Sequence, residues 1–247
     1  MRRGVVIRTV AALGALASLA PGAQGQRVRG PGGFVGVSFV AADAVGDLGA
    51  LVDQGFGMQL EGGVPVALNG HVRVRGDLGF LVYGHERQRF CYGLSCRLVT
   101  DLTTTNSILY GGFGPELVLG TGAVEPYVHA TAGLAGFVTS SSLDDHDGYG
   151  PYLETTNYSD VVFAWKAGGG LRMRVGNGFR PVFLDFGVDW HDNGVADFLT
   201  AGDIVDHADG SISVFPNRSE ADLVTFRLGV AVGFPSRSGY RERRGRR

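Results

Sequence analysis

Few residues in this sequence combine the types and spacing that nucleophilic catalysis requires. His129 and Thr131 are two positions apart, so on a strand they share one face. A histidine beside a hydroxyl is the usual nucleophile–base pair, but serine suits the role better and no carboxylate is assigned to orient this histidine. His85 and His191 have acidic neighbours without a matched acidic pair. We therefore expect no catalytic residue and interpret His129 as a polar residue inside the fold.

The chain has two cysteines, Cys91 and Cys96, in a polar stretch. In an oxidising compartment this spacing favours a local disulfide, and two free thiols are the alternative. A metal site between them is poorly supported, because no second pair of cysteine or histidine residues lies nearby. We expect a disulfide.

Acidic residues gather in two segments that carry little apolar periodicity. Divalent cations favour such carboxylates, and Asp145-x-Asp147-Gly148 is a fragment of a calcium-binding loop, but the later ligands of that loop are missing. We expect solvated surface charge that offers a place for an external ligand, with no metal or cofactor. The acidic residues are Asp144, Asp145, Asp147, Glu154 and Asp160 in the first segment, and Asp192, Asp197, Asp203, Asp206, Asp209 and Glu220 in the second.

Neither nucleic acid nor a nucleotide phosphate is an expected ligand. The formal net charge is −2, which gives no global field that would attract nucleic acid. Gly168-Gly169-Gly170 lies inside a strand-like stretch and not before a helix, where a phosphate-binding loop would be placed.

The clearest structural signal is the stretch 223–234, LVTFRLGVAVGF. Apolar residues occupy every second position, with small or polar residues between them. Successive side chains of a strand point to opposite faces, so this is a ribbon with one apolar and one polar or small face. The apolar positions are Val224, Phe226, Leu228, Val230, Val232 and Phe234.

Seven further stretches have strand character, and their connections alternate in length. The strands are 35–39, 56–61, 72–82, 104–119, 128–134, 163–174 and 182–190; the faces of 104–119 are ambiguous. Connections 65–70, 120–125 and 176–180 are short, whereas 41–53, 84–101, 139–160 and 191–222 are long. An even number of strands with short turns at one end and long loops at the other predicts an all-β, eight-stranded, antiparallel up-and-down transmembrane β-barrel.

Two barrel types fit this alternation, and they differ in which face points outward. A soluble calycin-like barrel places the charges outside in water around an apolar cavity. A membrane barrel places them in the lumen, where both signs are present and can pair. We favour the membrane barrel. The expected lumen-lining charges are Arg73, Arg75, Asp77, Lys166, Arg172, Arg174, Asp185, Asp189 and Arg227.

Aromatic residues near the strand ends are a second argument for a membrane barrel. Membrane barrels carry girdles of aromatic residues at both interfaces. The expected girdle residues are Tyr83, Trp165 and Trp190 at the long loops, and Tyr127, Phe179 and Phe234 at the turns.

The two ends of the chain differ from the barrel region. Residues 1–25 combine arginines, an apolar stretch and a small-x-small site, which predicts a cleaved signal peptide. Residues 26–32 form a short N-terminal segment, 33–234 the barrel, and 235–247 a basic tail. We expect export through this signal and insertion into a bacterial outer membrane.

Taken together, the final strand, Gly114-Pro115, Pro126-Tyr127-Val128 and the alternation of loops and turns resemble the small outer-membrane barrels of the OmpA/OmpX/OmpW type. The resemblance implies that both termini and the turns lie in the periplasm and the long loops outside the cell. It also implies that outer-membrane lipid surrounds the barrel, and that the insertion machinery reads Phe226, Leu228, Val230, Val232 and Phe234. This chain departs from the pattern, because thirteen residues follow Phe234.

The expected function is that of a non-enzymatic barrel that anchors surface loops for envelope integrity or external interaction. A small porin-like channel is the alternative, because glycines on the lumen face leave room for water, and a lipid-modifying enzyme is a weaker one. The lumen glycines are Gly57, Gly79, Gly168, Gly170, Gly187, Gly229 and Gly233.

Overall fold

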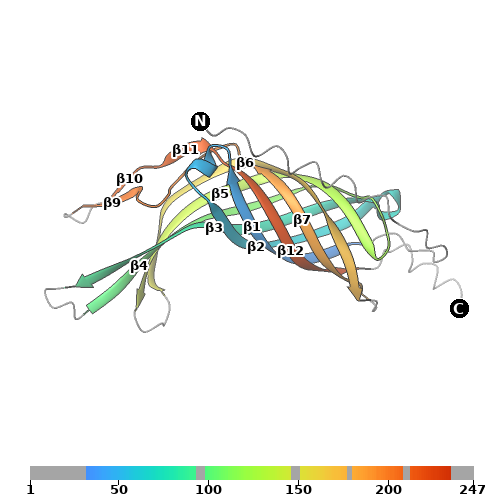
Figure 1. Cartoon of the computed structure of the whole chain (residues 1–247), viewed down its shortest axis with the longest axis horizontal. Helices are drawn as coiled ribbons and strands as arrows, with labels where there is room; N and C mark the ends of the chain where they lie inside the picture. The colour runs from blue at the N-terminus through green and yellow to red at the C-terminus, as the bar shows by residue number, and fades with distance from the viewer. Residues whose placement is uncertain (1–31, 93–97, 146–150, 177–179, 208–211, 235–247) are drawn as a thin grey trace, which may run out of the picture.

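The computed structural model describes residues 32–92, 98–145, 151–176, 180–207 and 212–234. Eight strands close into one antiparallel barrel in the order β1-β12-β7-β6-β5-β4-β3-β2, so each barrel strand pairs with the barrel strands before and after it in the chain, and the first pairs with the last. Figure 1 shows the strands tilted around the barrel. The predicted all-β, eight-stranded, up-and-down fold is confirmed.

The barrel strands differ greatly in length. Four are short: β1 (Phe34–Val45), β2 (Gln54–Ala67), β7 (Val182–Asp192) and β12 (Asp222–Gly233). Four neighbouring strands are much longer: β3 (Val72–Tyr92), β4 (Leu98–Val118), β5 (Val124–Asp145) and β6 (Pro151–Gly176). Their extra length projects from one end of the barrel as a curved sheet (Figure 1).

The connections 84–101 and 139–160 were predicted as loops, and the structure corrects this. Pairing of β3 with β4 continues as far as Tyr92 and Leu98, and pairing of β5 with β6 as far as Asp144 and Pro151. These segments are rich in serine, threonine and charge on both faces. They therefore lack the apolar alternation by which a half-buried strand is recognised.

The other two long connections also contain regular structure. Between β1 and β2 lies a short 3-10 helix, η2 (Leu48–Ala50). Segment 191–222, predicted as a loop, holds two small two-stranded sheets, one nested inside the other in the chain: β8 (Val195–Phe198) pairs with β11 (Asn217–Glu220), and β9 (Ile204–Asp206) pairs with β10 (Ile212–Val214). We call this end of the barrel the loop end.

The opposite end, here the turn end, carries the short connections. The β2–β3 turn contains a second 3-10 segment, η3 (Leu68–Gly70). Asn69 has a φ of 56° there, a left-handed conformation that asparagine tolerates better than most residues.

The inward and outward faces follow the predicted alternation. On β12, Phe226, Leu228 and Val230 are exposed, whereas Thr225 and Arg227 are buried. The ambiguous stretch 104–119 is resolved, with Ile108 and Tyr110 inward. Large apolar side chains therefore cover the outside of the barrel, among them Val35, Phe39, Met58, Leu60, Leu78, Phe80, Leu109, Phe113, Leu134, Phe163, Leu171, Phe186 and Val188.

Two of the expected girdle tyrosines point inward, which corrects their assignment. Tyr127 is buried, with its hydroxyl on Asp185 inside the barrel. Tyr83 packs against Phe137 and Phe198. Trp165, Trp190 and Phe234 are exposed, as expected for girdle residues.

Several expectations fall outside the described residues. These are the signal peptide (1–25), most of the segment 26–32, the tail (235–247), Phe179, and the side chains of Cys91 and Cys96. Among the residues that are described, no helix has the length and apolar character needed to cross a membrane.

Candidate functional site: the barrel interior and the groove at its loop end

The barrel interior holds charges of both signs in equal number. Six carboxylates and six cations, contributed by β2–β7 and β12, form ion pairs with one another. Because lone charges are costly in a low-dielectric interior, this balance makes a charged lumen tenable. The acids are Glu61, Asp77, Glu116, Glu125, Asp185 and Asp189; the bases are Arg73, Arg75, Lys166, Arg172, Arg174 and Arg227.

Arg172 occupies the centre of the ion network near the turn end. Its guanidinium donates to both oxygens of Glu116 at 2.7 and 2.6 Å, and through Nε to Asp185 at 3.0 Å. The rings of Phe34 and Tyr127 lie on it at 3.8 and 3.9 Å from their centroids. Arg172 thus combines a bidentate ion pair with cation–π contacts to two rings, the arrangement that a planar guanidinium favours.

Glu61 links three strands in the middle of the lumen. It accepts hydrogen bonds from Arg75 of β3, from Arg227 of β12 at 2.8 Å, and from Gln59 on its own strand at 2.9 Å. Arg227 also donates through Nε to Asp189 of β7 at 2.6 Å. These bonds join strands that are neighbours or next neighbours in the ring, and the bond from Arg227 to the Tyr127 hydroxyl of β5, at 3.3 Å, spans the lumen.

Lys166, the sole lysine of the sequence, crosses the lumen nearer the loop end. Its ammonium donates to Asp77 at 2.6 Å and to Gln59 at 3.1 Å, and lies 5.3 Å from the ring centroid of Tyr110. Strands β4 and β5 lie between β3 and β6 in the ring, so this pair bridges the interior.

The structure brings the nine predicted lumen charges together inside the barrel. Eight of them are buried, and the Arg174 side chain at the turn end is 30% exposed. Sequence reasoning missed Glu61, Glu116 and Glu125, although Glu61 lies on the polar face of its strand. Glu116 was hidden by the ambiguous faces of its stretch, and Glu125 by its assignment to a turn.

His129 and Thr131 face the lumen and are buried, as expected. The Nε2 atom of His129 lies 3.4 Å from Asp189, and neither ring nitrogen has a hydrogen-bond partner. The carboxylate that the sequence did not assign is therefore present, but the imidazole is enclosed by the barrel wall and lipid cannot reach it.

Neighbouring groups occupy the space beside the lumen glycines. A Cβ added to Gly79 would meet the ring of Tyr110, and one added to Gly187 would meet the guanidinium of Arg227. In an eight-stranded barrel the interior is just wide enough for side chains to fill it. Glycine here makes room for large neighbours and does not leave a void.

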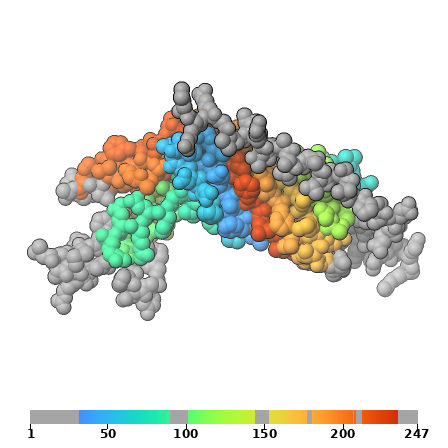
Figure 2. Space-filling view, in the orientation of Figure 1, coloured from blue at the N-terminus to red at the C-terminus, as the bar shows by residue number. Residues whose placement is uncertain are grey.

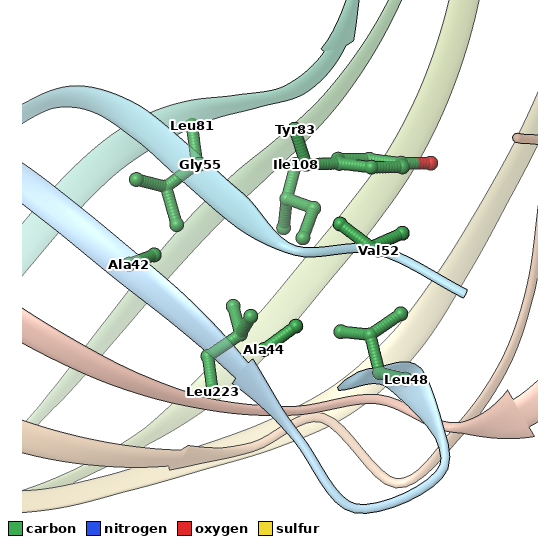
Figure 3. A pocket seen from close by; sticks show the side chains of 9 residues that line it. All are labelled: Ala42, Ala44, Leu48, Val52, Gly55, Leu81, Tyr83, Ile108 and Leu223. Carbon is green, nitrogen blue, oxygen red and sulfur yellow. The ribbon is translucent and has the colours of Figure 1, made fainter. Parts of the chain in front are cut away.

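An apolar plug closes the loop end of the lumen. Leu48 of η2 and Val52 point toward Leu81, Ile108 and Leu223 of the barrel wall (Figure 3). Phe198 and Ala196 of β8, with Phe137 of β5, belong to the same buried cluster. The cavity left beneath Leu48 has a volume of about 10 Å³, and one beside Asp77 and Lys166 about 20 Å³, each close to the space of a single water.

Beyond the plug lies a groove of about 240 Å³, the loop-end groove. One side is the inner face of the extended sheet, and the other is the segment from Leu199 to β10. Figure 2 shows the two projections, the orange arm of β9–β10 and the green extension of β3, leaving the same end of the barrel. The sheet side contributes Gly84, His85, Glu86, Gln88, Leu102, Thr104, Asn106, Thr139, Ser141, Thr155 and Asn157; the arm contributes Leu199, Thr200, Ala201, Gly202, Ile204 and Ile212.

Hydroxyl and amide groups join the strands across the groove floor. Ser141 forms hydrogen bonds with the Thr104 hydroxyl at 2.9 Å and with Nδ2 of Asn157 at 2.6 Å. Thr139 donates to Oδ1 of Asn106 at 2.6 Å. These bonds hold the floor in a fixed arrangement, and lone pairs of its hydroxyl oxygens remain able to accept further hydrogen bonds.

Charged residues of the extension gather outside the groove. Arg87 and Arg89 bind the Asp101 carboxylate at 2.6 and 3.2 Å. Burial acts to raise the pKa of Asp101, but the hydrogen bonds from the two arginines outweigh it and lower that pKa. None of these three residues lines the groove.

Several acids of the long connections have structural partners. Asp160 accepts from the backbone N–H of Asp197, and Asp203 accepts from the backbone N–H and hydroxyl of Thr200. The side chains of Asp144, Asp145, Asp147, Asp206 and Asp209 lie outside the described residues. Within the described ranges, no group of three or more His, Cys, Asp or Glu residues is arranged to hold a metal ion.

Solved structures similar to this chain include outer-membrane proteins. Neisserial surface protein A is 14% identical, with a TM-score of 0.44, and the match covers 82% of this chain and 96% of that one. Ail of Yersinia pestis, in complex with the heparin analogue sucrose octasulfate, is 12% identical, with a TM-score of 0.41 over 83% and 99% of the two chains. The N-terminal β-barrel domain of Pseudomonas aeruginosa OprF is 12% identical, with a TM-score of 0.32 over 83% and 99%.

No family model matches this sequence, and no curated protein matches it.

Proposed function

We propose that this protein is a non-enzymatic anchor in a bacterial outer membrane, whose closed barrel holds a binding surface outside the cell. The observation that carries the proposal is the contrast between the two faces of the barrel wall. Apolar side chains cover the outside, and paired charges fill the inside. Lipid around the barrel stabilises the first face, and ion pairing stabilises the second.

The filled interior supports an anchor over a channel. The ion pairs of Lys166 and Arg227 bridge the lumen, and the plug around Leu48 and Phe198 lies above them. An ion crossing this barrel must displace both the ion pairs and the apolar plug. The glycines that suggested a pore lie beside Tyr110, Arg227 and other large groups.

The position of His129 supports a role without catalysis. A lipid-modifying enzyme of the membrane must present its base and nucleophile to a lipid substrate. His129 and Thr131 instead face the ion network inside the barrel.

The asymmetry of the strands supports a binding surface at the loop end. Strands β3–β6 continue well beyond the ends of β1, β2, β7 and β12, far more strand than is needed to close the barrel. We propose that the loop end lies outside the cell and the turn end in the periplasm, as the resemblance to small outer-membrane barrels implies.

Amine labelling of intact cells tests this placement. The sole lysine, Lys166, is buried in the lumen, so the α-amino group at the N-terminus is the main background for a membrane-impermeant amine reagent, and the unsubstituted chain, labelled in parallel, measures it. We expect Thr156→Lys on the extension to be labelled on intact cells, and Ala123→Lys in the β4–β5 turn only after lysis. Labelling of the Ala123→Lys variant on intact cells, without labelling of the Thr156→Lys variant, would contradict the proposal.

A further inference from the structure

The loop-end groove has the chemistry of a site for a neutral sugar. We propose that it binds an uncharged sugar ring, presented free or at the end of a surface polysaccharide. This inference rests on the proposed function, because it requires the loop end to face the outside of the cell.

The lining of the groove is poorly suited to ligands that are recognised by charge. Among the described residues, no lysine or arginine lines it, and its one basic side chain is the exposed imidazole of His85, which neutralises a phosphate or sulfate group only when it is protonated. Its one carboxylate, Glu86, already accepts a hydrogen bond from Gln88 at 2.9 Å. The cations of the extension, Arg87 and Arg89, are occupied by Asp101 away from the groove.

The floor of the groove suits a ligand that carries many hydroxyl groups. Thr104, Thr139, Ser141 and Thr155 present hydroxyls, and each hydroxyl oxygen has two lone pairs that can accept hydrogen bonds. Thr139 already donates its own proton to Asn106, and Ser141 is bonded to Thr104 and Asn157. A sugar hydroxyl both donates and accepts, so it can donate to the lone pairs that these internal bonds leave free. The bonds that Ser141 forms across the strands fix the floor before a ligand arrives, which lowers the entropic cost of binding.

The opposite side of the groove suits the C–H face of a sugar ring. Leu199, Ile204 and Ile212 line this side, facing the polar floor. A wholly apolar ligand would leave the hydroxyls and amides of the floor without partners, which is costly. A ring with hydroxyls around its edge and a C–H face fits both sides at once.

The size of the groove fits a small ligand. A cavity of about 240 Å³ holds a single sugar ring with room for part of its neighbour. It lies just below the usual range for drug-sized ligands, roughly 300 Å³ and above. It opens at the end of the molecule (Figure 2), so the rest of a polysaccharide can continue outward.

Ligand-detected NMR on the full chain, folded in lipid nanodiscs, tests the inference. The first arm uses neutral polysaccharide extracted from the cells that make the protein, and the second uses maltotriose and lactose. Sucrose octasulfate serves as a polyanion in a third arm. Saturable binding in either of the first two arms supports the inference and identifies the source of the sugar. Absence of binding in both of the first two arms, or binding of sucrose octasulfate alone, would overturn the inference.

A pair of matched variants locates the site. Ser141→Ala with Thr155→Val removes two hydroxyls from the floor, and should weaken binding about tenfold, as expected for two neutral hydrogen bonds. Ser142→Ala with Thr156→Val makes the same changes at the adjacent positions of β5 and β6, which do not line the groove, and should change affinity less than about twofold. Equal effects of the two pairs would overturn the placement.

A third variant keeps the test decisive if the floor variant does not fold. Ala201→Trp fills the groove from an exposed position on the arm and removes no hydrogen bond of the floor. It should abolish sugar binding, and unchanged binding would overturn the inference. Absence of sugar binding by a folded chain that labels from the outside at Thr156→Lys overturns this inference alone. Reversed labelling overturns the proposed function.

Discussion

Burying an arginine is tolerable only where hydrogen-bond acceptors and other favourable contacts surround its whole guanidinium, and Arg172 meets that condition. It is 1% exposed, with Glu116 and Asp185 taking its donors and two aromatic rings covering its faces. A buried ion pair adds little net stability when it is complete, but removing one partner leaves the other charge uncompensated. The network is therefore more important for holding one arrangement of the barrel than for adding stability.

Replacing Arg172 should destabilise the barrel strongly. Arg172→Gln leaves Glu116 and Asp185 short of positive charge, and should lower the free energy of unfolding by about 3–5 kcal/mol. Arg218→Gln removes an exposed arginine that pairs with Asp197, and should cost about 0–1 kcal/mol. Urea unfolding in detergent micelles measures both, and equal losses would contradict the account of the lumen.

Glycines that face the lumen should tolerate substitution less well than those that face outward. A Cβ at Gly170 would lie 2.6 Å from the hydroxyl of Tyr127 and closer still to the backbone oxygen of Phe186, whereas a Cβ at Gly136 meets nothing nearer than 3.8 Å. Gly170→Ala should therefore cost about 1–3 kcal/mol, as overpacking does, and Gly136→Ala almost nothing. Thermal midpoints from heat-dependent gel mobility decide between them, and equal midpoints for the two variants would contradict the close packing around Gly170.

At the residue scale, the sequence predicts which side chains enter the lumen but not which residues they pair with there. Alternation places Arg227 and Arg172 on the inner face directly. Their partners depend on the stagger of the strands around the ring, which no local pattern encodes. Glu61 is 166 positions from Arg227, and the two meet only because the barrel closes.

Among the elements, β12 is the strand whose pattern is clearest. Its apolar positions are exposed in the structure, Phe226 at 53% and Val230 at 44%, and β1 and β7 pair with it on either side. The proposal that the insertion machinery reads Phe226, Leu228, Val230, Val232 and Phe234 requires this apolar face.

A charge on the outer face of β12 should impair membrane insertion. Val230→Arg places a cation among apolar side chains in the barrel, at a cost of about 2–4 kcal/mol at the middle of a bilayer. Thr156→Arg introduces the same charge on the exposed extension of β6 and should insert normally. The folded fraction after refolding into lipid vesicles measures both, and equal yields would contradict the assignment of the outer face to lipid.

The extended sheet should be dispensable for folding of the barrel. Replacing 87–103 with Asn-Gly joins β3 to β4 by a tight hairpin turn and keeps every pair between Val72 and Glu86 on β3. We expect this variant to keep heat-dependent gel mobility. Failure to fold would show that the extension supports the barrel.

The extension also marks the limit of prediction at the element scale. Barrel strands in contact with lipid have an apolar face, so the alternation of apolar with polar or small residues can be recognised in the sequence. The extension pairs Thr103–Thr105 with Ser140–Ser142, and both of its faces meet polar surroundings. Without an apolar face, the two-residue hydrophobic period cannot be detected in the sequence, so a strand in the extension is predicted as a loop.

At the scale of the whole molecule, three layers follow one another along the barrel axis. Paired charges fill the lumen, the apolar plug covers them at the loop end, and the groove lies beyond the plug. The plug separates the charged lumen from the groove. Neither the plug nor the groove was predictable from sequence, because each is assembled from segments that are distant in the chain and whose loops carry no periodicity.

Planar-bilayer conductance of the refolded chain tests the central claim, a closed membrane anchor, most directly. Heat-dependent gel mobility confirms that the inserted protein is folded, and a general porin in the same bilayers confirms that open pores are detected. The account predicts a folded barrel that passes no current at either polarity, because ion pairs and the plug fill its interior. Reproducible unitary steps from the folded chain would contradict it, and would make the protein a channel lined by Lys166, Arg172 and Asp185.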